Sequence, residues 1–210
     1  NTAQKTKYEQ MLLPVVMFDP PDFTDPATCD NEFLLQSSLW ACMLGDRRGS
    51  YQFDEYDRMV IPATDVESQA VALFGPDVKL EHKTIGDMEN AYQYDSEIAS
   101  YHVPIIAMTG FATPRVEKIT MKQDGCQLII GYVPPTTVLS INYDSSGDLE
   151  EEPSKYMLYE LRKADKTFYL YAVSTITGDT RVDGEFDPAT GRVDNFSSSS
   201  GGLSSSMVSP

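Results

Sequence analysis

The chain has 210 residues, enough for one large domain or for one ordinary domain with appendages. Its 32 acidic residues outnumber its 16 basic ones and give a formal charge of −16, so nucleic-acid phosphates and anionic membrane surfaces would repel it. The longest apolar run, Met11–Phe18, contains Pro14 and falls far short of the roughly 18 residues that a membrane-spanning helix needs. Composition therefore excludes these partners without indicating a function.

The first third of the sequence predicts two helices separated by a turn-rich linker. Residues 1–7 are polar and are interpreted as a spacer, like one that follows a cleavage site. A short helix from Tyr8 should end near Leu13, because Pro14 removes a backbone donor. The next helix should run to Leu44, with a capping residue among Thr24, Asp25 and Asp30. Its inward stripe has helical spacing: Phe33, Leu34, Ser37, Ala41 and Leu44.

A third helix has the clearest local signal in the chain. Thr64 and Glu67 match a capping box, in which the hydroxyl and the carboxylate each accept from an otherwise unpaired backbone amide. The helix should therefore begin at Thr64 and stop at Gly75, just before Pro76. Its buried face should comprise Val66, Ala70, Leu73 and Phe74.

Beyond the third helix the apolar pattern changes to a period of two, which predicts strands. Three hairpins are expected, over residues 91–103, 116–133 and 156–175. The second should turn at Gln123-Asp124-Gly125, which tolerates positive φ, and its run Leu128-Ile129-Ile130 is apolar on both faces, as in a central strand. Helices followed by antiparallel strands predict an α+β fold, with the N-terminal helices packed on one face of a curved antiparallel sheet.

The composition changes again towards the C-terminus. Residues 1–176 are expected to form a single α+β domain and residues 177–210 a C-terminal appendage. Residues 177–184 are echoed by residues 190–195, which suggests a small hairpin. From Ser197 onward the chain is rich in serine and glycine, and on its own it has too little apolar surface to offset the entropy of ordering. This last segment is therefore expected to be a flexible tail.

Residues suited to nucleophilic or metal chemistry are scarce. The chain has three cysteines, an odd number that cannot all pair internally, and two histidines. Cys42 lies in an apolar helical stretch and Cys126 opens a strand, so both should be buried thiols. A Cys29–Cys126 disulfide is compatible with the sequence, which does not decide it. The sequence contains no glycine-rich phosphate loop and no Gly-x-Ser-x-Gly elbow.

The segment Asn142–Glu152 is the nearest match to a metal motif. Oxygen-bearing side chains at alternate positions, with a glycine at the sixth, match the first half of a calcium loop: Asn142, Asp144, Ser146 and Asp148. The match fails at the twelfth position, where Pro153 stands in place of the bidentate glutamate. A solvated acidic loop is the preferred interpretation and a weak calcium site is the alternative. No catalytic residue, resident metal or cofactor is assigned.

His102 is the best candidate for a general base. It lies in a predicted strand, and Asp95 and Glu97 across the hairpin loop are carboxylates that would hold it. The sequence nominates no nucleophile beside it, and a half-buried strand histidine is the preferred interpretation, as it is for His82. The acidic run at residues 54–57 is interpreted as a solvated face rather than as paired carboxylates for glycoside hydrolysis.

Tyrosine is the most distinctive residue type, with 12 in the chain and several on predicted strands. A tyrosine suits a half-buried sheet face, where its ring packs and its hydroxyl reaches water, but it also suits a surface that binds a ligand or a partner. Ordinary sheet packing is the preferred interpretation. If the concave face of the sheet binds a ligand, the candidate residues are Tyr92, Tyr94, Tyr101, His102, Tyr132, Tyr169 and Tyr171.

Five segments together are similar to a known group of proteins. They are the helix end Leu44-Gly45, the segment from Val60-Ile61-Pro62-Ala63 to Leu73-Phe74-Gly75, and the strands Tyr101-His102-Val103-Pro104, Arg115-Val116-Glu117-Lys118-Ile119 and Tyr156-Met157-Leu158-Tyr159-Glu160-Leu161. These segments resemble uncharacterised ectodomains of Gram-positive cell-surface lipoproteins. The resemblance covers about residues 8–175 and implies a cystatin-like or nuclear-transport-factor-like α+β fold. It implies no catalytic residue.

The sequence as a whole predicts a non-enzymatic domain, extracellular or anchored at the cell surface, that binds a protein or a small-molecule ligand. The alternative is a small hydrolase or isomerase of the cone-shaped α+β type, with its pocket between the helices and the sheet. Nucleic acid is not expected as a partner. Membrane association is expected only through an anchor that precedes Asn1 and was lost with a targeting segment.

Overall fold

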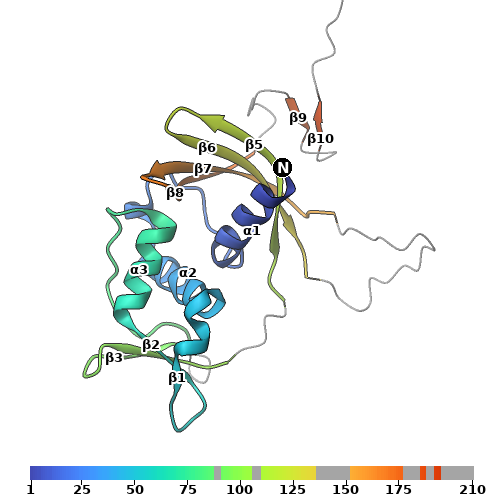
Figure 1. The fold of residues 1–210 in the computed structure, drawn as a ribbon. Helices are drawn as coiled ribbons and strands as arrows, with labels where there is room; N and C mark the ends of the chain where they lie inside the picture. The colour runs from blue at the N-terminus through green and yellow to red at the C-terminus, as the bar shows by residue number, and fades with distance from the viewer. Residues whose placement is uncertain (88–90, 106–109, 136–151, 177–184, 188–191, 195–210) are drawn as a thin grey trace, which may run out of the picture.

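The computed structural model describes residues 1–87, 91–105, 110–135 and 152–176, and the backbone of residues 185–187 and 192–194. This part of the chain has an α+β fold with three α-helices and two four-stranded antiparallel sheets, so the predicted class is confirmed. Figure 1 shows the helices as a layer between a large sheet at the top and a small sheet at the bottom. Instead of the one sheet predicted, the helices therefore have a sheet on each side.

α1 (Thr2–Val16) extends further than predicted at both ends. Its first two turns include the residues interpreted as a spacer, and the side chain of Asn1 caps the helix. Pro14 lies in the last turn, where its missing N–H removes only one intrahelical hydrogen bond. Burial of Val15 and Val16 offsets that loss. Both predicted boundaries, the polar spacer and the end before Pro14, are therefore wrong.

α2 (Asn31–Leu44) has the predicted end and one of the predicted caps. The carboxylate of Asp30 accepts hydrogen bonds from the first backbone amides of the helix, which would otherwise be unpaired. The helix is apolar around its circumference, as expected of a helix that lies between two packed layers. Its buried apolar side chains are divided between two cores: Leu34 and Ala41 on the side of the large sheet, and Leu35, Leu39 and Trp40 on the side of the small sheet.

α3 (Ala63–Phe74) begins one residue before the predicted capping box. Strand β2 (Met59–Pro62) leads directly into the helix, and the Ala63 amide donates to the Ala99 carbonyl, so the helix starts without a side-chain cap. The capping box is therefore wrong. Gly75 ends the helix as predicted, with a φ of +93° that favours glycine. The predicted buried face is confirmed: Val66, Ala70, Leu73 and Phe74.

The large sheet is a meander of consecutive strands. Its order is β5 (Thr113–Lys122), β6 (Gly125–Val133), β7 (Tyr156–Ala164) and β8 (Thr167–Thr175). The hairpins β5–β6 and β7–β8 confirm two of the three predicted. β6 is a central strand, as its apolar run predicts, and each residue from Leu128 to Ile130 is at most 1 % exposed.

Gly125 is needed for close packing between strands. It pairs with Arg162 on β7, and a Cβ atom at this position would lie 1.9 Å from the carbonyl oxygen of Leu161. The glycine is not among the described residues that have positive φ. The turn geometry that the Asp-Gly sequence predicts is therefore wrong, and the physical reason for a glycine here is the nearness of a neighbouring strand.

The small sheet has the order β1-β2-β4-β3 and much shorter strands. β3 (Gln93–Asp95) and β4 (Ser100–Val103) confirm the third predicted hairpin. The sequence does not predict β1 (Gln52–Phe53) or β2, because segments this short carry little periodicity. The side chains that face the helices are buried: Met59, Ile61, Tyr101 and Val103.

Two apolar cores therefore lie on opposite faces of the helix layer. The first joins all three helices to the large sheet, where α1 packs on β5. The second joins the helices to the small sheet, around Trp40 of α2 and Val66 of α3. None of the helices in the described ranges is long and apolar enough to cross a membrane.

β9 (Glu185–Asp187) and β10 (Arg192–Asp194) pair antiparallel within the predicted appendage. The first echoed segment, at residues 177–184, and the serine- and glycine-rich tail lie outside the described residues. The boundary at residue 176 stays a prediction.

Candidate functional site

One candidate site is a cleft of about 680 Å³ between the three helices and the start of β8. α1, the C-terminal end of α2 and the second half of α3 supply most of its lining, and Thr167 and Phe168 add the edge of the large sheet. These elements converge below the large sheet in Figure 1. Four segments that are separate in the sequence therefore meet at one concave site.

Small residues open this cleft, and larger apolar residues form its walls. Ala41 near the end of α2 and Ala72 on α3 line the cleft with a single methyl group each, and Gly45 lines it without a side chain. Several of the apolar wall residues are only partly buried: Met11, Leu13, Leu44 and Phe168. Polar side chains also line the cleft: Lys7, Gln10, Asp46 and Gln69. This mixed lining suits an organic molecule with an apolar body and a polar group.

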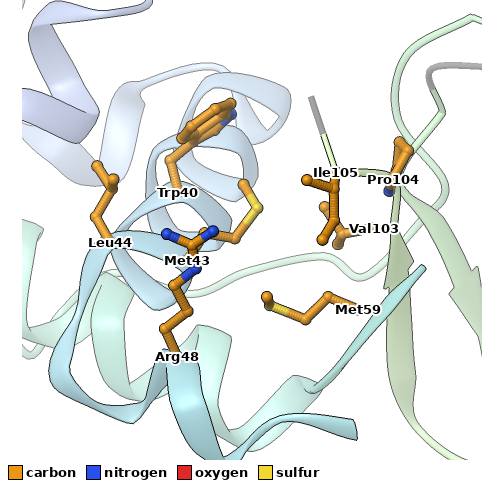
Figure 2. Close-up of a pocket in the computed structure, with 8 residues that line it drawn as sticks. All are labelled: Trp40, Met43, Leu44, Arg48, Met59, Val103, Pro104 and Ile105. Atoms are coloured by element: carbon orange, nitrogen blue, oxygen red, sulfur yellow. The ribbon is translucent and has the colours of Figure 1, made fainter. Parts of the chain in front are cut away.

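A second pocket, shown in Figure 2, lies between the end of α2 and the end of β4. Met43 and Met59 extend into it, while Trp40 and Ile105 form part of its walls. Its volume is about 40 Å³, which has room for one or two water molecules or a methyl group. Arg48 also lines the pocket. This pocket can receive the end of one side chain, but it is too small to hold an organic ligand.

His102 lies on the face of the small sheet turned away from the helices, since its neighbours in β4 point inward. Its Nδ1 is 2.7 Å from Oδ2 of Asp54, and because an ionised carboxylate only accepts, Nδ1 carries the proton. Nε2 is 4.0 Å from Oδ2 of Asp95, the predicted partner. The ring is therefore oriented like that of a general base, but no serine, threonine or cysteine of the described residues hydrogen-bonds to Nε2.

Asp54 is the centre of this network. It accepts hydrogen bonds from the backbone amides of Tyr56 and Arg58, from Nε of Arg58 and from His102. Desolvation would raise the pKa of Asp54, but the hydrogen bonds from Arg58 and His102 outweigh it and hold the pKa well below its usual range. The side chain is only 12 % exposed, so the interpretation of this acidic run as a solvated face is wrong for Asp54.

Three of the predicted binding tyrosines lie on the inner side of the small sheet, where protein groups engage them. The hydroxyl of Tyr92 accepts from Nε1 of Trp40 at 2.8 Å. The hydroxyl of Tyr101 lies 3.0 Å from Nδ1 of His82, and the ring of Tyr94 stacks on the same histidine. Burial raises the pKa of Tyr101 to about 12, so this hydroxyl stays protonated at neutral pH.

The other three predicted tyrosines lie on the large sheet. Tyr132 on β6 is buried, and its hydroxyl is 2.5 Å from that of Tyr159 on β7. Tyr169 and Tyr171 lie on the edge strand β8 and are half-buried. The ring of Tyr169 packs against Gly75, and the guanidinium of Arg162 lies over the ring of Tyr171. The seven candidates are therefore divided between two sheets on opposite sides of the helices, and their binding role stays a prediction.

The weak calcium candidates lie outside the described residues: Asn142, Asp144, Ser146 and Asp148. Within the described ranges, no group of three or more His, Cys, Asp or Glu side chains is placed to hold a metal ion. The structure thus leaves the calcium alternative as a prediction.

All three cysteines are free thiols, so Cys29 and Cys126 form no disulfide in this structure. Cys42 and Cys126 are buried, as predicted. Burial, reinforced by nearby aspartates, raises the pKa of Cys29 to about 11, and burial raises that of Cys42 to about 12. At neutral pH these two thiols are protonated and make poor nucleophiles.

The sequence missed the residues of the cleft and the partner of His102. Lys7 falls in the segment interpreted as a spacer, and Asp46 follows a predicted helix end. Asp54 lies 48 residues before His102, so no local pattern links the two. Ala41 and Gly45, two small residues near the end of α2, are the one local signal, and by themselves they fit a helix stop equally well.

No family model, curated protein or solved structure matches this chain.

Proposed function

We propose that this protein is a non-enzymatic binding domain, extracellular or anchored at the cell surface, and that the helix-lined cleft is its binding site. The observation that carries the proposal is the cleft itself. Its volume of about 680 Å³ falls within the range of roughly 300–1,000 Å³ that is usual for sites of small organic ligands. Apolar walls with a few polar groups are also the usual lining of such sites.

The placement of the tyrosines supports the cleft rather than the sheet as the binding site. Tyr92, Tyr101 and Tyr132 direct their hydroxyls to other protein groups, so these atoms are already engaged. The partly buried side chains of Met11 and Phe168, in contrast, have apolar surface left for a ligand.

The arrangement of α1 against the large sheet supports the cystatin-like, cone-shaped form of the fold. A helix that precedes and crosses an antiparallel meander is the common feature, and α1 packs on β5 in this manner. In this proposal, α2, α3 and the small sheet are inserted between the helix and the meander. The insertion supplies two of the three helices that line the cleft.

The alternative, a hydrolase or isomerase, has a pocket in the predicted place but lacks its predicted base there. His102 does not line the cleft and lies on the outer face of the small sheet. Binding is therefore the function that the geometry supports better.

Binding of Nile red, an uncharged dye whose fluorescence depends on the polarity of its surroundings, tests the proposal. We expect its fluorescence to rise on binding to the wild-type protein. Ala72→Trp, which fills the cleft from an exposed position on α3, should remove most of that signal. Val71→Trp is the matched control, because Val71 is exposed on the same helix and does not line the cleft. Equal dye binding by the Ala72→Trp variant and the wild type would contradict the proposal.

A further inference from the structure

The cleft carries opposite charges from two different elements. Lys7 on α1 and Asp46 after α2 are its charged lining residues among those described. The two do not pair with each other, and neither makes an ion pair with another described residue. Both charges therefore remain available to a ligand.

The topology places these charges towards opposite ends of the cleft. Lys7 is next to Tyr8, whose ring contacts Phe168 at the start of β8, so this end adjoins the large sheet. Asp46 opens η2 (Asp46–Ser50), the segment that leads from α2 to β1 of the small sheet. Figure 1 shows the start of α1 close to the large sheet and the end of α2 close to the small one.

Apolar surface lies between the two charges. Lys7, Met11 and Pro14 follow one another along one face of α1, at spacings of four and three residues. Seven residues of helix span about 10 Å, the reach of a medium-length alkyl chain. Leu44 and Phe168, which are partly buried, complete the apolar surface on the other elements.

We propose that the cleft binds a monocarboxylate with a medium-length alkyl chain, of which octanoate is the simplest example. The inference rests on the proposed binding function and adds the chemical class of the ligand. The carboxylate lies at Nζ of Lys7, where a charge-assisted hydrogen bond is available. The alkyl chain lies against Met11 and Phe168 and points towards Asp46. A second carboxylate at the far end would meet the negative charge of Asp46, which excludes dicarboxylates.

Isothermal titration calorimetry with four chemically related probes tests this inference. We expect octanoate to bind the wild-type protein more tightly than octanamide, which has the same chain without the charge, and than octanedioate, which adds a second carboxylate. We expect octyltrimethylammonium, with the opposite charge, to bind more weakly than octanoate. Raising the salt concentration should weaken the binding of octanoate and leave that of octanamide nearly unchanged.

Variants of the protein then test where the carboxylate and the alkyl chain of octanoate bind. Lys7→Gln should weaken octanoate binding roughly threefold and leave octanamide binding unchanged, since it removes one ion pair made by an exposed lysine. Lys79→Gln, at an exposed lysine outside the cleft, is the matched control and should bind octanoate like the wild type. Ala72→Trp should abolish octanoate binding, and circular dichroism verifies that each variant is folded.

The outcomes separate this inference from the proposed function. Equal affinities for octanoate and octanamide, or no effect of Lys7→Gln, would overturn the carboxylate assignment, while Nile red binding that depends on Ala72 would preserve the binding function. Octanoate binding that survives Ala72→Trp would place the site elsewhere and overturn the inference. If no probe binds and Nile red fluorescence does not depend on Ala72, both proposals fail.

Discussion

The two sheets that flank the helix layer are held together by different means. The strands of the large sheet have 9 or 10 residues and pair with their neighbours in the sequence. The strands of the small sheet have 2 to 4 residues and pair in the order β1-β2-β4-β3. Long ladders and continuous apolar strands hold the large sheet together, whereas the short ladders of the small sheet leave a larger share of its stability to side-chain hydrogen bonds.

Several such bonds around the small sheet link separate segments. Among them are the bonds that join Trp40 to Tyr92, His82 to Tyr101, and His102 to Asp54. The comparison teaches that the large sheet is most sensitive to changes in backbone fit and core packing. The small sheet should be sensitive instead to the loss of single polar partners. Each of these contributes less to the free energy of unfolding than the close backbone fit of the large sheet does.

The largest effect is expected where two strands of the large sheet approach closely. Gly125→Val places a Cβ atom where the carbonyl oxygen of Leu161 lies 1.9 Å away, so the backbone of β6 or β7 must move. We expect a loss of about 3 kcal/mol or more in the free energy of unfolding, measured by urea denaturation.

Gly49→Ala is the control for this substitution, since a Cβ atom there meets no other atom within 4 Å. We expect it to change the free energy of unfolding by less than about 0.5 kcal/mol. A Gly125→Val variant as stable as Gly49→Ala would show that β6 and β7 can move apart at little cost. That result would contradict the proposal that the large sheet depends on close backbone fit.

The large sheet is also the part of the fold that the sequence predicts best. Its hairpins have clear alternation and turns, and the apolar run at residues 128–130 identifies the central strand. Only two of the four strands of the small sheet are predicted, because β1 and β2 are too short to show an alternation of apolar and polar residues. The start of α3 is missed for a tertiary reason: its first amide is paired by Ala99, in the turn before β4, and not by a local cap.

The second prediction concerns a buried pair of tyrosines in the core of the large sheet, Tyr132 and Tyr159. Replacing either tyrosine by phenylalanine leaves the other hydroxyl buried without this partner, so each single variant should lose about 2 kcal/mol. The double variant removes both hydroxyls and should lose clearly less than the sum of the single losses. Additive losses in urea denaturation would show that the two hydroxyls are not coupled.

The candidate site is less predictable than the fold, for physical reasons that its residues illustrate. The cleft exists because Ala41 and Ala72, on separate helices, come together, and neither has a distinctive sequence context. Lys7 enters the cleft only because α1 extends to Thr2. The tyrosines are conspicuous in the sequence, yet the structure uses several of them as hydrogen-bonding core residues, which the sequence does not distinguish from surface residues.

The third prediction tests how much one polar partner contributes to the stability of the small sheet. Tyr92→Phe removes the acceptor of the Trp40 indole N–H, which is buried, so we expect a loss of about 1 to 2 kcal/mol in urea denaturation. Because Trp40 is the only tryptophan of the chain, its fluorescence should also change in the folded state. The matched control is Tyr56→Phe, at a largely exposed tyrosine, which should alter neither quantity. A loss as large as that of Gly125→Val would contradict the order of effects proposed for the two sheets.

The smallest effect is expected on the outer face of the small sheet, and it should depend on pH. Hydrogen bonds hold the pKa of Asp54 in the folded protein below its ordinary value of 3.8, so the ionised carboxylate stabilises the fold above that value. The contribution is lost as the pH falls from about 4 towards the lower pKa of the folded state.

Asp54→Asn should therefore lower the melting temperature by a few degrees or less at about pH 5, and the difference in melting temperature from the wild type should narrow as the pH approaches about 2. Asp77→Asn, at an exposed carboxylate, should parallel the wild type over the same range. A difference between Asp54→Asn and the wild type that stays constant below pH 4 would mean that the Asp54 carboxylate is not linked to folding, and that the outer face of the small sheet depends on something other than this hydrogen-bonded charge.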